Sequence, residues 1–146
     1  MQFDPVCNHE FSPDGADNAL WQFRELIINL ITLSSDFDQQ RKIIGPWAVA
    51  DEMAEDFYSY YTLVKNVYIE YGLLNNEQLK GLDQLDKFLE IKSGTLDDFW
   101  DDGKLESNGD WKVVRGMATG ILKKLNMDDL EFEFDQAGKR IVRKNH

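Results

Sequence analysis

The sequence contains few of the residues that build catalytic and metal centres. It has a single cysteine, Cys7, and two histidines, His9 and His146. One cysteine cannot form an intramolecular disulfide, and this usage is typical of a reducing cytoplasm. Cys7 and His9 lack the second pair that a four-ligand zinc site needs, and neither histidine is well placed to activate a nucleophile. We therefore expect no metal site, no cofactor and no enzyme.

Nucleotide-binding motifs and long apolar runs are also absent. The chain contains neither G-x-x-x-x-G-K-[ST] nor G-x-G-x-x-G, and no glutamate is followed three residues later by histidine, as in two-metal helical bundles. The longest nearly apolar run, residues 26–33, is far shorter than the ~20 residues that span a bilayer. Residues 1–5 do not resemble a secretory signal. We expect a soluble, cytoplasmic protein that does not enter a membrane.

Negative charge is in excess and unevenly distributed. The net charge is −11, with −8 on residues 1–60, −6 on residues 61–111 and +3 on residues 112–146. Such a field repels phosphate backbones and anionic lipids, and it accelerates encounters with basic partners. We expect no direct nucleic-acid binding and favour a basic protein partner. The same surface is also explained by solubility alone.

Helical periodicity runs through most of the chain. The longest pattern lies between the breakers Gly45-Pro46 and Gly72, which suit a helix start and a C-terminal cap, and it predicts one helix of about 26 residues. Its apolar face is wider than one neighbour can cover, so several helices should pack around it. Further helices are expected to begin at Asp17, after a cap within Ser34-Ser35-Asp36, near Glu77 and after a cap at Asp110.

The two ends of the chain depart from this pattern. Residues 1–16 are rich in turn formers and predict an irregular arm. Residues 130–144 alternate apolar and charged positions around a central turn, which predicts a β-hairpin with an acidic strand facing a basic one. Gly116 and Gly120 lie four apart in the last helix and predict the close approach of another helix. The expected fold is mainly α: a single domain over residues 1–146, a bundle of about five helices with a C-terminal β-hairpin.

Two clusters combine carboxylates with aromatic rings. Exposed aromatic side chains beside carboxylates are typical of binding hot spots, because the ring supplies contact area and the carboxylate pairs with arginine. In the alternative interpretation the rings pack onto other helices and the acids form a solvated face. The aspartate pairs of the second cluster, at i, i+4 spacing, can also bind a hard cation such as Mg²⁺. The predicted partner-binding residues are Asp51, Glu52, Glu55, Asp56, Tyr58 and Tyr61 in the first cluster, and Asp97, Asp98, Trp100, Asp101 and Asp102 in the second.

The stretch from Asp51 to Tyr61, with the pair Tyr60-Tyr61 beside acidic residues, resembles the bacterial immunity proteins that neutralise nuclease toxins, such as the colicin DNase immunity family. The stretch from Phe99-Trp100-Asp101-Asp102 through Trp111-Lys112-Val113-Val114-Arg115 resembles, in general style, segments of helical immunity proteins of contact-dependent and polymorphic toxin systems. The resemblance implies that an acidic helix and a tyrosine pair cover the active surface of a basic toxin without touching its catalytic metal.

The leading functional hypothesis is therefore an acidic binding protein, a monomer or weak dimer, that neutralises a basic bacterial toxin domain. The second hypothesis is an interaction module or DNA mimic that uses the same acids against another basic partner. A carboxylate- and magnesium-dependent enzyme comes third.

Overall fold

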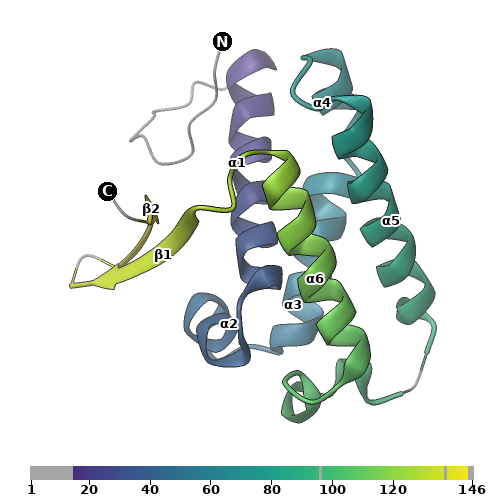
Figure 1. Cartoon of the computed structure of the whole chain (residues 1–146), viewed down its shortest axis with the longest axis vertical. Helices are drawn as coiled ribbons and strands as arrows, with labels where there is room; N and C mark the ends of the chain where they lie inside the picture. The colour runs from purple at the N-terminus through teal and green to yellow at the C-terminus, as the bar shows by residue number, and fades with distance from the viewer. Residues whose placement is uncertain (1–14, 96, 137, 145–146) are drawn as a thin grey trace.

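The computed structural model describes residues 15–95, 97–136 and 138–144. Within these ranges the chain forms six α-helices and then an antiparallel β-hairpin, so the prediction of a mainly α fold with a C-terminal hairpin is confirmed (Figure 1). The predicted arm lies outside the described residues except for its last two positions, which already belong to the first helix. The elements are α1 (Gly15–Ser34), α2 (Phe37–Ile44), α3 (Val49–Phe57), a π-helix (Tyr58–Thr62), α4 (Lys65–Glu70), α5 (Asn76–Ser93), two 3₁₀ turns (Asp98–Trp100 and Asp102–Lys104), α6 (Gly109–Lys124), β1 (Leu130–Asp135) and β2 (Gly138–Arg143).

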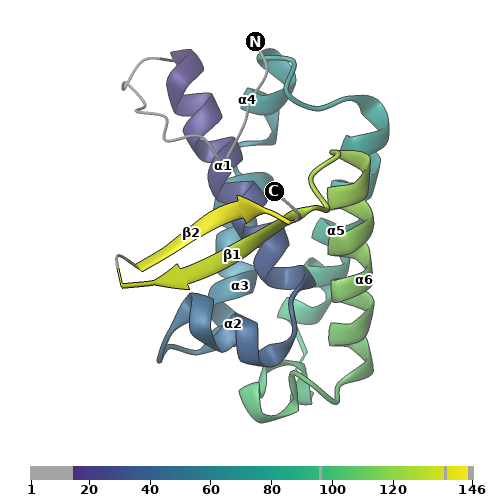
Figure 2. The ribbon, with the colours of Figure 1, turned by 60° about the vertical axis from the view of Figure 1, so that its left-hand side comes forward.

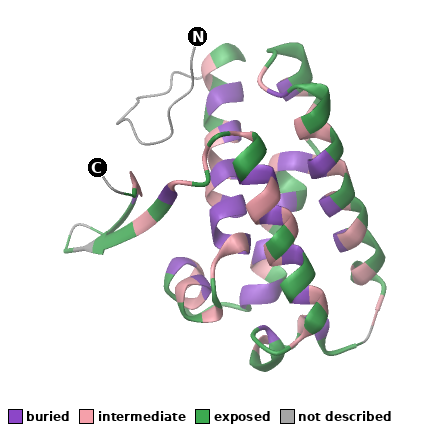
Figure 3. Cartoon of the chain, in the orientation of Figure 1, coloured by how far each residue is buried: buried purple, intermediate pink, exposed green. Residues whose placement is uncertain are grey.

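Helix α1 is the centre of the bundle. It packs against α2, α3, the π-helix, α4 and α6, and buried positions recur along it and along the helices beside it (Figure 3). Leu26, Asn29 and Ile31 are all buried although they point in different directions around the helix axis. Burial on several sides of one helix places the hydrophobic core around α1.

The prediction of one continuous helix between residues 46 and 72 is wrong, because the segment is interrupted. The amide of Leu63 donates to the carbonyl of Tyr58 at 3.0 Å, five residues back, and Val64, with φ −119°, interrupts the helix before α4. This π-helix contains one residue more than an α-turn, so the side chains on either side of it are rotated relative to one another. The described residues therefore contain six α-helices, where about five were expected, because this segment is divided into α3 and α4.

Helix starts depend on caps both near and far in sequence. The cap predicted within Ser34-Ser35-Asp36 is confirmed and is Asp36, whose carboxylate accepts from the amide of Gln39 at 2.9 Å. The cap of α6 is Asn108, not Asp110 as predicted. Helix α3 begins at Val49, three residues after Pro46, because the carboxylate of Asp102 accepts from the amides of Val49 and Ala50 at 2.9 and 3.0 Å.

The close helix approach predicted at Gly116 and Gly120 is wrong. A Cβ added at either glycine would meet no atom within 4 Å. A close contact between α5 and α6 occurs instead at Gly81 of α5, where a Cβ would lie 3.3 Å from Cγ1 of Ile121 in α6. Gly81 therefore supplies the bare backbone at which α5 meets α6.

The hairpin crosses the outside of the bundle in front of α1 (Figure 2). Glu133 of β1 faces Arg140 of β2 and forms an ion pair with it, so the predicted pairing of acidic and basic strands is confirmed. Leu130 and Ile141 are buried on the face toward the helices, and Lys139 Nζ donates to the carbonyl of Ile43 in α2. None of the helices in residues 15–95, 97–136 and 138–144 is long and apolar enough to cross a bilayer.

Candidate functional site

The first predicted cluster is divided between two faces of α3 and the π-helix. Asp51, Glu55 and Tyr58 line a groove beside α5. Glu52 and Asp56 line a different cavity, beside α1 and the hairpin. Neighbouring positions on a helix point about 100° apart, because a full turn takes 3.6 residues. The prediction of one continuous contact patch is therefore wrong.

The groove beside α5, here called the acidic groove, has a volume of about 830 Å³. Its carboxylates are Asp51 and Glu55 from α3 and Asp86 and Glu90 from α5. No lysine, arginine or histidine of the described ranges lines it. Asp86 accepts a hydrogen bond from the hydroxyl of Thr62 at 2.6 Å, whereas the other three carboxylates form no ion pair within the described part of the chain. The groove thus gathers negative charge that the surrounding residues do not neutralise.

Aromatic side chains accompany these carboxylates. Tyr58, on the α3 wall, is 54% exposed, which confirms the prediction that it points away from the core. Phe57 is buried and contributes to the floor, and Trp100 lies on the wall as well. Trp100 is held in place by a T-shaped contact with Phe99, with ring centroids 4.9 Å apart. The groove therefore offers both carboxylates and ring faces to an occupant.

Tyr61 does not belong to this surface, and its predicted role as a contact residue is wrong. Its side chain is fully buried, and its hydroxyl donates to Oδ1 of Asp83 at 2.5 Å. Lys65 Nζ contacts the same carboxylate at 3.0 Å. Burial, together with the hydrogen bond to Asp83, raises the pKa of Tyr61. Tyr61 remains protonated and joins the π-helix to α5.

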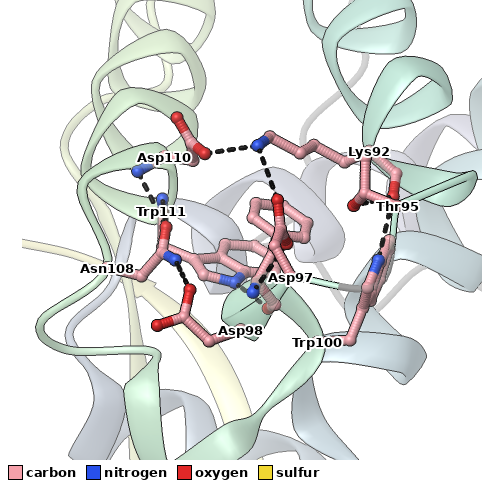
Figure 4. Close-up of polar contacts among 9 residues, drawn as sticks. Lys92, Thr95, Asp97, Asp98, Trp100, Asn108, Asp110 and Trp111 are labelled. Atoms are coloured by element: carbon pink, nitrogen blue, oxygen red, sulfur yellow. Dashed lines mark hydrogen bonds and ion pairs between the residues drawn. The ribbon is translucent and has the colours of Figure 1, made fainter.

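Most of the second predicted cluster forms an internal network (Figure 4). Lys92 at the end of α5 pairs with Asp97 at 3.2 Å and also with Asp110 of α6. The backbone amide of Phe99, and then Lys92, lower the pKa of Asp97. Asp98 accepts from Nδ2 of Asn108 at 2.7 Å. These carboxylates connect α5 to α6 through the intervening loop.

The remaining members of the second cluster have structural partners too. Asp101 accepts from the amide of Gly103 at 2.9 Å, and Asp102 caps α3 while pairing with Arg41 at 3.3 Å. The indole N–H of Trp100 donates to the carbonyl of Lys92 at 2.9 Å. Asp97 and Asp102 are thus paired with basic side chains, whereas Asp98 and Asp101 are exposed and accept hydrogen bonds from neutral groups. Of this cluster only Trp100 lines the acidic groove. No group of three or more His, Cys, Asp or Glu side chains in the described ranges is arranged to hold a metal ion.

No family model, curated protein or solved structure matches this chain. The function must therefore be argued from the geometry of its own surfaces.

The cavity on the other face of α3, here called the inner cavity, lies between α1, α2, α3 and the hairpin and has a volume of about 400 Å³. Burial, followed by the charges of Glu52, Glu25 and Glu55, raises the pKa of Asp56 to about 6. Burial also raises the pKa of Glu25, which the sequence analysis did not select. The feature of the sequence that could have identified Glu25 is its position as a carboxylate among the apolar residues of the central helix.

Proposed function

We propose that this protein binds a basic segment of a partner protein in the acidic groove. The observation that carries the proposal is the convergence of carboxylates from two helices on one groove without a lysine or arginine of the described chain among its lining residues. Like charges facing one another destabilise the free protein, and a cationic occupant removes that cost.

The aromatic side chains favour arginine within that segment. A guanidinium group stacks on the face of a tyrosine or tryptophan ring and also forms paired hydrogen bonds with a carboxylate. Tyr58 and Trp100 line the same groove as Glu55 and Glu90, so the groove offers an arginine both kinds of contact. Opposite charges also raise the association rate, which is an advantage for a protein that must capture its partner quickly.

Toxin neutralisation is the form of partner binding that we propose. An enzyme that acts on nucleic acid binds its substrate through a basic surface. If that surface docks over the groove, it is covered and the substrate is excluded from it. The resemblance of residues 51–61 to immunity proteins supports this form of the proposal, now through Asp51, Glu55 and Tyr58, which share the groove.

The experiment compares two charge-reversed variants with the wild type. The groove variant carries Glu55→Lys and Glu90→Lys. The control carries Glu106→Lys and Glu131→Lys, which change the net charge equally at exposed positions outside the groove. A partner is captured from native lysate, identified, purified and titrated by calorimetry, and the growth arrest caused by its expression is measured with and without each variant.

We expect the wild type and the control to bind a basic partner and to relieve its toxicity, and the groove variant to do neither. Equal affinity of the groove variant and the wild type for the partner would refute binding in the groove. A partner that binds in the groove but does not arrest growth would refute toxin neutralisation while leaving partner binding in place.

A further inference from the structure

The inner cavity is a second candidate binding site, independent of the acidic groove. Its walls come from α1, α2, α3, the π-helix and the hairpin. Figure 2 shows the hairpin crossing in front of α1, with α2 and α3 close by. A volume of about 400 Å³ lies within the range of small-molecule sites.

Hydrogen-bond acceptors without donors converge on this cavity. Glu25 from α1 and Glu52 and Asp56 from α3 form no ion pair within the described residues. Their mutual repulsion and burial raise the pKa of Asp56, with burial the larger cause. Lys139 acts in the opposite direction without restoring the usual value. The carboxylates are therefore only partly neutralised in the free protein.

Asn29 provides a second, uncharged acceptor on the same wall. Its side chain is only 3% exposed, and its Nδ2 donates to the carbonyl of Met53 at 3.0 Å. Its Oδ1 is buried and has no hydrogen-bond partner. A buried acceptor left without a donor destabilises a folded protein, so the unpaired Oδ1 of Asn29 calls for a specific explanation.

The basic residues around the cavity offset the carboxylates only in part: the charges of Arg24 and Lys139 act to lower the pKa of Glu25, but burial outweighs them. Lys139 directs its Nζ to the carbonyl of Ile43, and Arg140 pairs with Glu133. Arg24 also lines the cavity, and its Nε is a buried donor without an acceptor. The wall thus presents several acceptors for a cation and one donor for an oxygen atom.

We propose that the inner cavity binds a small molecule with a guanidinium or primary ammonium group and a nearby carboxyl or carbonyl oxygen. Glu25, Glu52 and Asp56 surround the cationic group, and Asn29 Oδ1 accepts one of its N–H donors. Arg24 Nε donates to the oxygen. Tyr60 and Phe132, also on the wall, provide ring faces beside the cation.

L-arginine is the probe that tests this site, and L-citrulline is its control because it has the same shape without the side-chain charge. Calorimetric titration at pH 7.5 should give saturable binding of arginine and at least about tenfold weaker binding of citrulline. Asp56→Asn and, as a second variant, Glu52→Gln should each weaken arginine binding at least about tenfold. The variant Glu55→Gln with Glu90→Gln, which removes charge from the acidic groove, should bind arginine as the wild type does.

Three results would overturn the proposal: no saturable binding to the wild type, citrulline binding as tight as arginine binding, or arginine binding that survives both Asp56→Asn and Glu52→Gln. Loss of arginine binding in the acidic-groove variant alone would place the arginine in the groove and would also reject the inner cavity as its site.

Discussion

Asp56 should make the protein less stable as the pH rises, and Asp56→Asn should remove that effect. The pKa of Asp56 is raised from 3.8 to about 6, first by burial and then by Glu52, Glu25 and Glu55. Between pH 3.8 and about pH 6 the carboxyl group of Asp56 is protonated in the folded protein but ionised in the unfolded chain. Stability linked to this group is therefore present below pH 4 and is lost as the pH rises to about 6.

The size of the effect follows from the shift. A shift of about two units corresponds to about 3 kcal/mol at 1.36 kcal/mol per unit. Asp56 is only half-buried, and solvent screening reduces this to about 1–2 kcal/mol. Asparagine has nearly the same shape as the protonated acid and no charge. We therefore expect Asp56→Asn to stabilise the free protein by about 1–2 kcal/mol at pH 8, and by roughly half as much at pH 5.

Urea unfolding followed by tryptophan fluorescence at pH 5 and pH 8 measures this difference directly. The matched control is Glu106→Gln, which removes one charge from an exposed loop outside both cavities. Its effect should be within about 0.5 kcal/mol at both pH values. A stability gain for Asp56→Asn that does not change with pH, or a loss of stability at pH 8, would refute the view that the inner cavity holds an under-neutralised carboxylate.

Three further substitutions test the packing described above. Asp102→Ala removes the distant cap of α3 and should lower the free energy of unfolding by about 1–3 kcal/mol in urea titrations; an unchanged midpoint would contradict the capping role. Gly116→Ala, in open space on α6, should raise stability by about 0.5–1 kcal/mol in thermal unfolding, whereas Gly81→Ala should gain less or destabilise, and equal gains would contradict the close contact at Gly81. Tyr61→Phe leaves Asp83 without its hydroxyl donor and should cost about 1–2 kcal/mol in urea unfolding, and a neutral effect would show that the hydrogen bond contributes nothing.

Local signals in the sequence predicted much of the fold. Asp36 caps the helix that follows it through a contact three residues away, and the alternation in residues 130–144 sets the register of the hairpin. Both features depend on neighbours in sequence or on a short turn. The interruption of the long helix was not predictable in this way, because apolar spacing continues through the π-helix, and the start of α3 depends on Asp102, more than fifty residues further along the chain.

The candidate sites were predicted less well, for two different reasons. The division of the first cluster follows from the helical period, since Asp51 and Glu55 share one face and Glu52 and Asp56 share another, so the sequence contained that information. The pairing of Asp97 could not be predicted from the sequence. Its partner Lys92 belongs to the preceding helix, and the geometry of the loop between them brings the two side chains together. Opposite charges close in sequence indicate pairing only when the turn between them is known.

The π-helix makes both cavities sensitive to chain length. Tyr58 from this turn lines the acidic groove, and Tyr60, two residues later, lines the inner cavity. Removing one residue from Tyr58–Thr62 would restore the ordinary count of an α-turn and would rotate everything after the deletion by about 100° relative to α3. A single-codon deletion at this point would therefore reshape two separate surfaces at once.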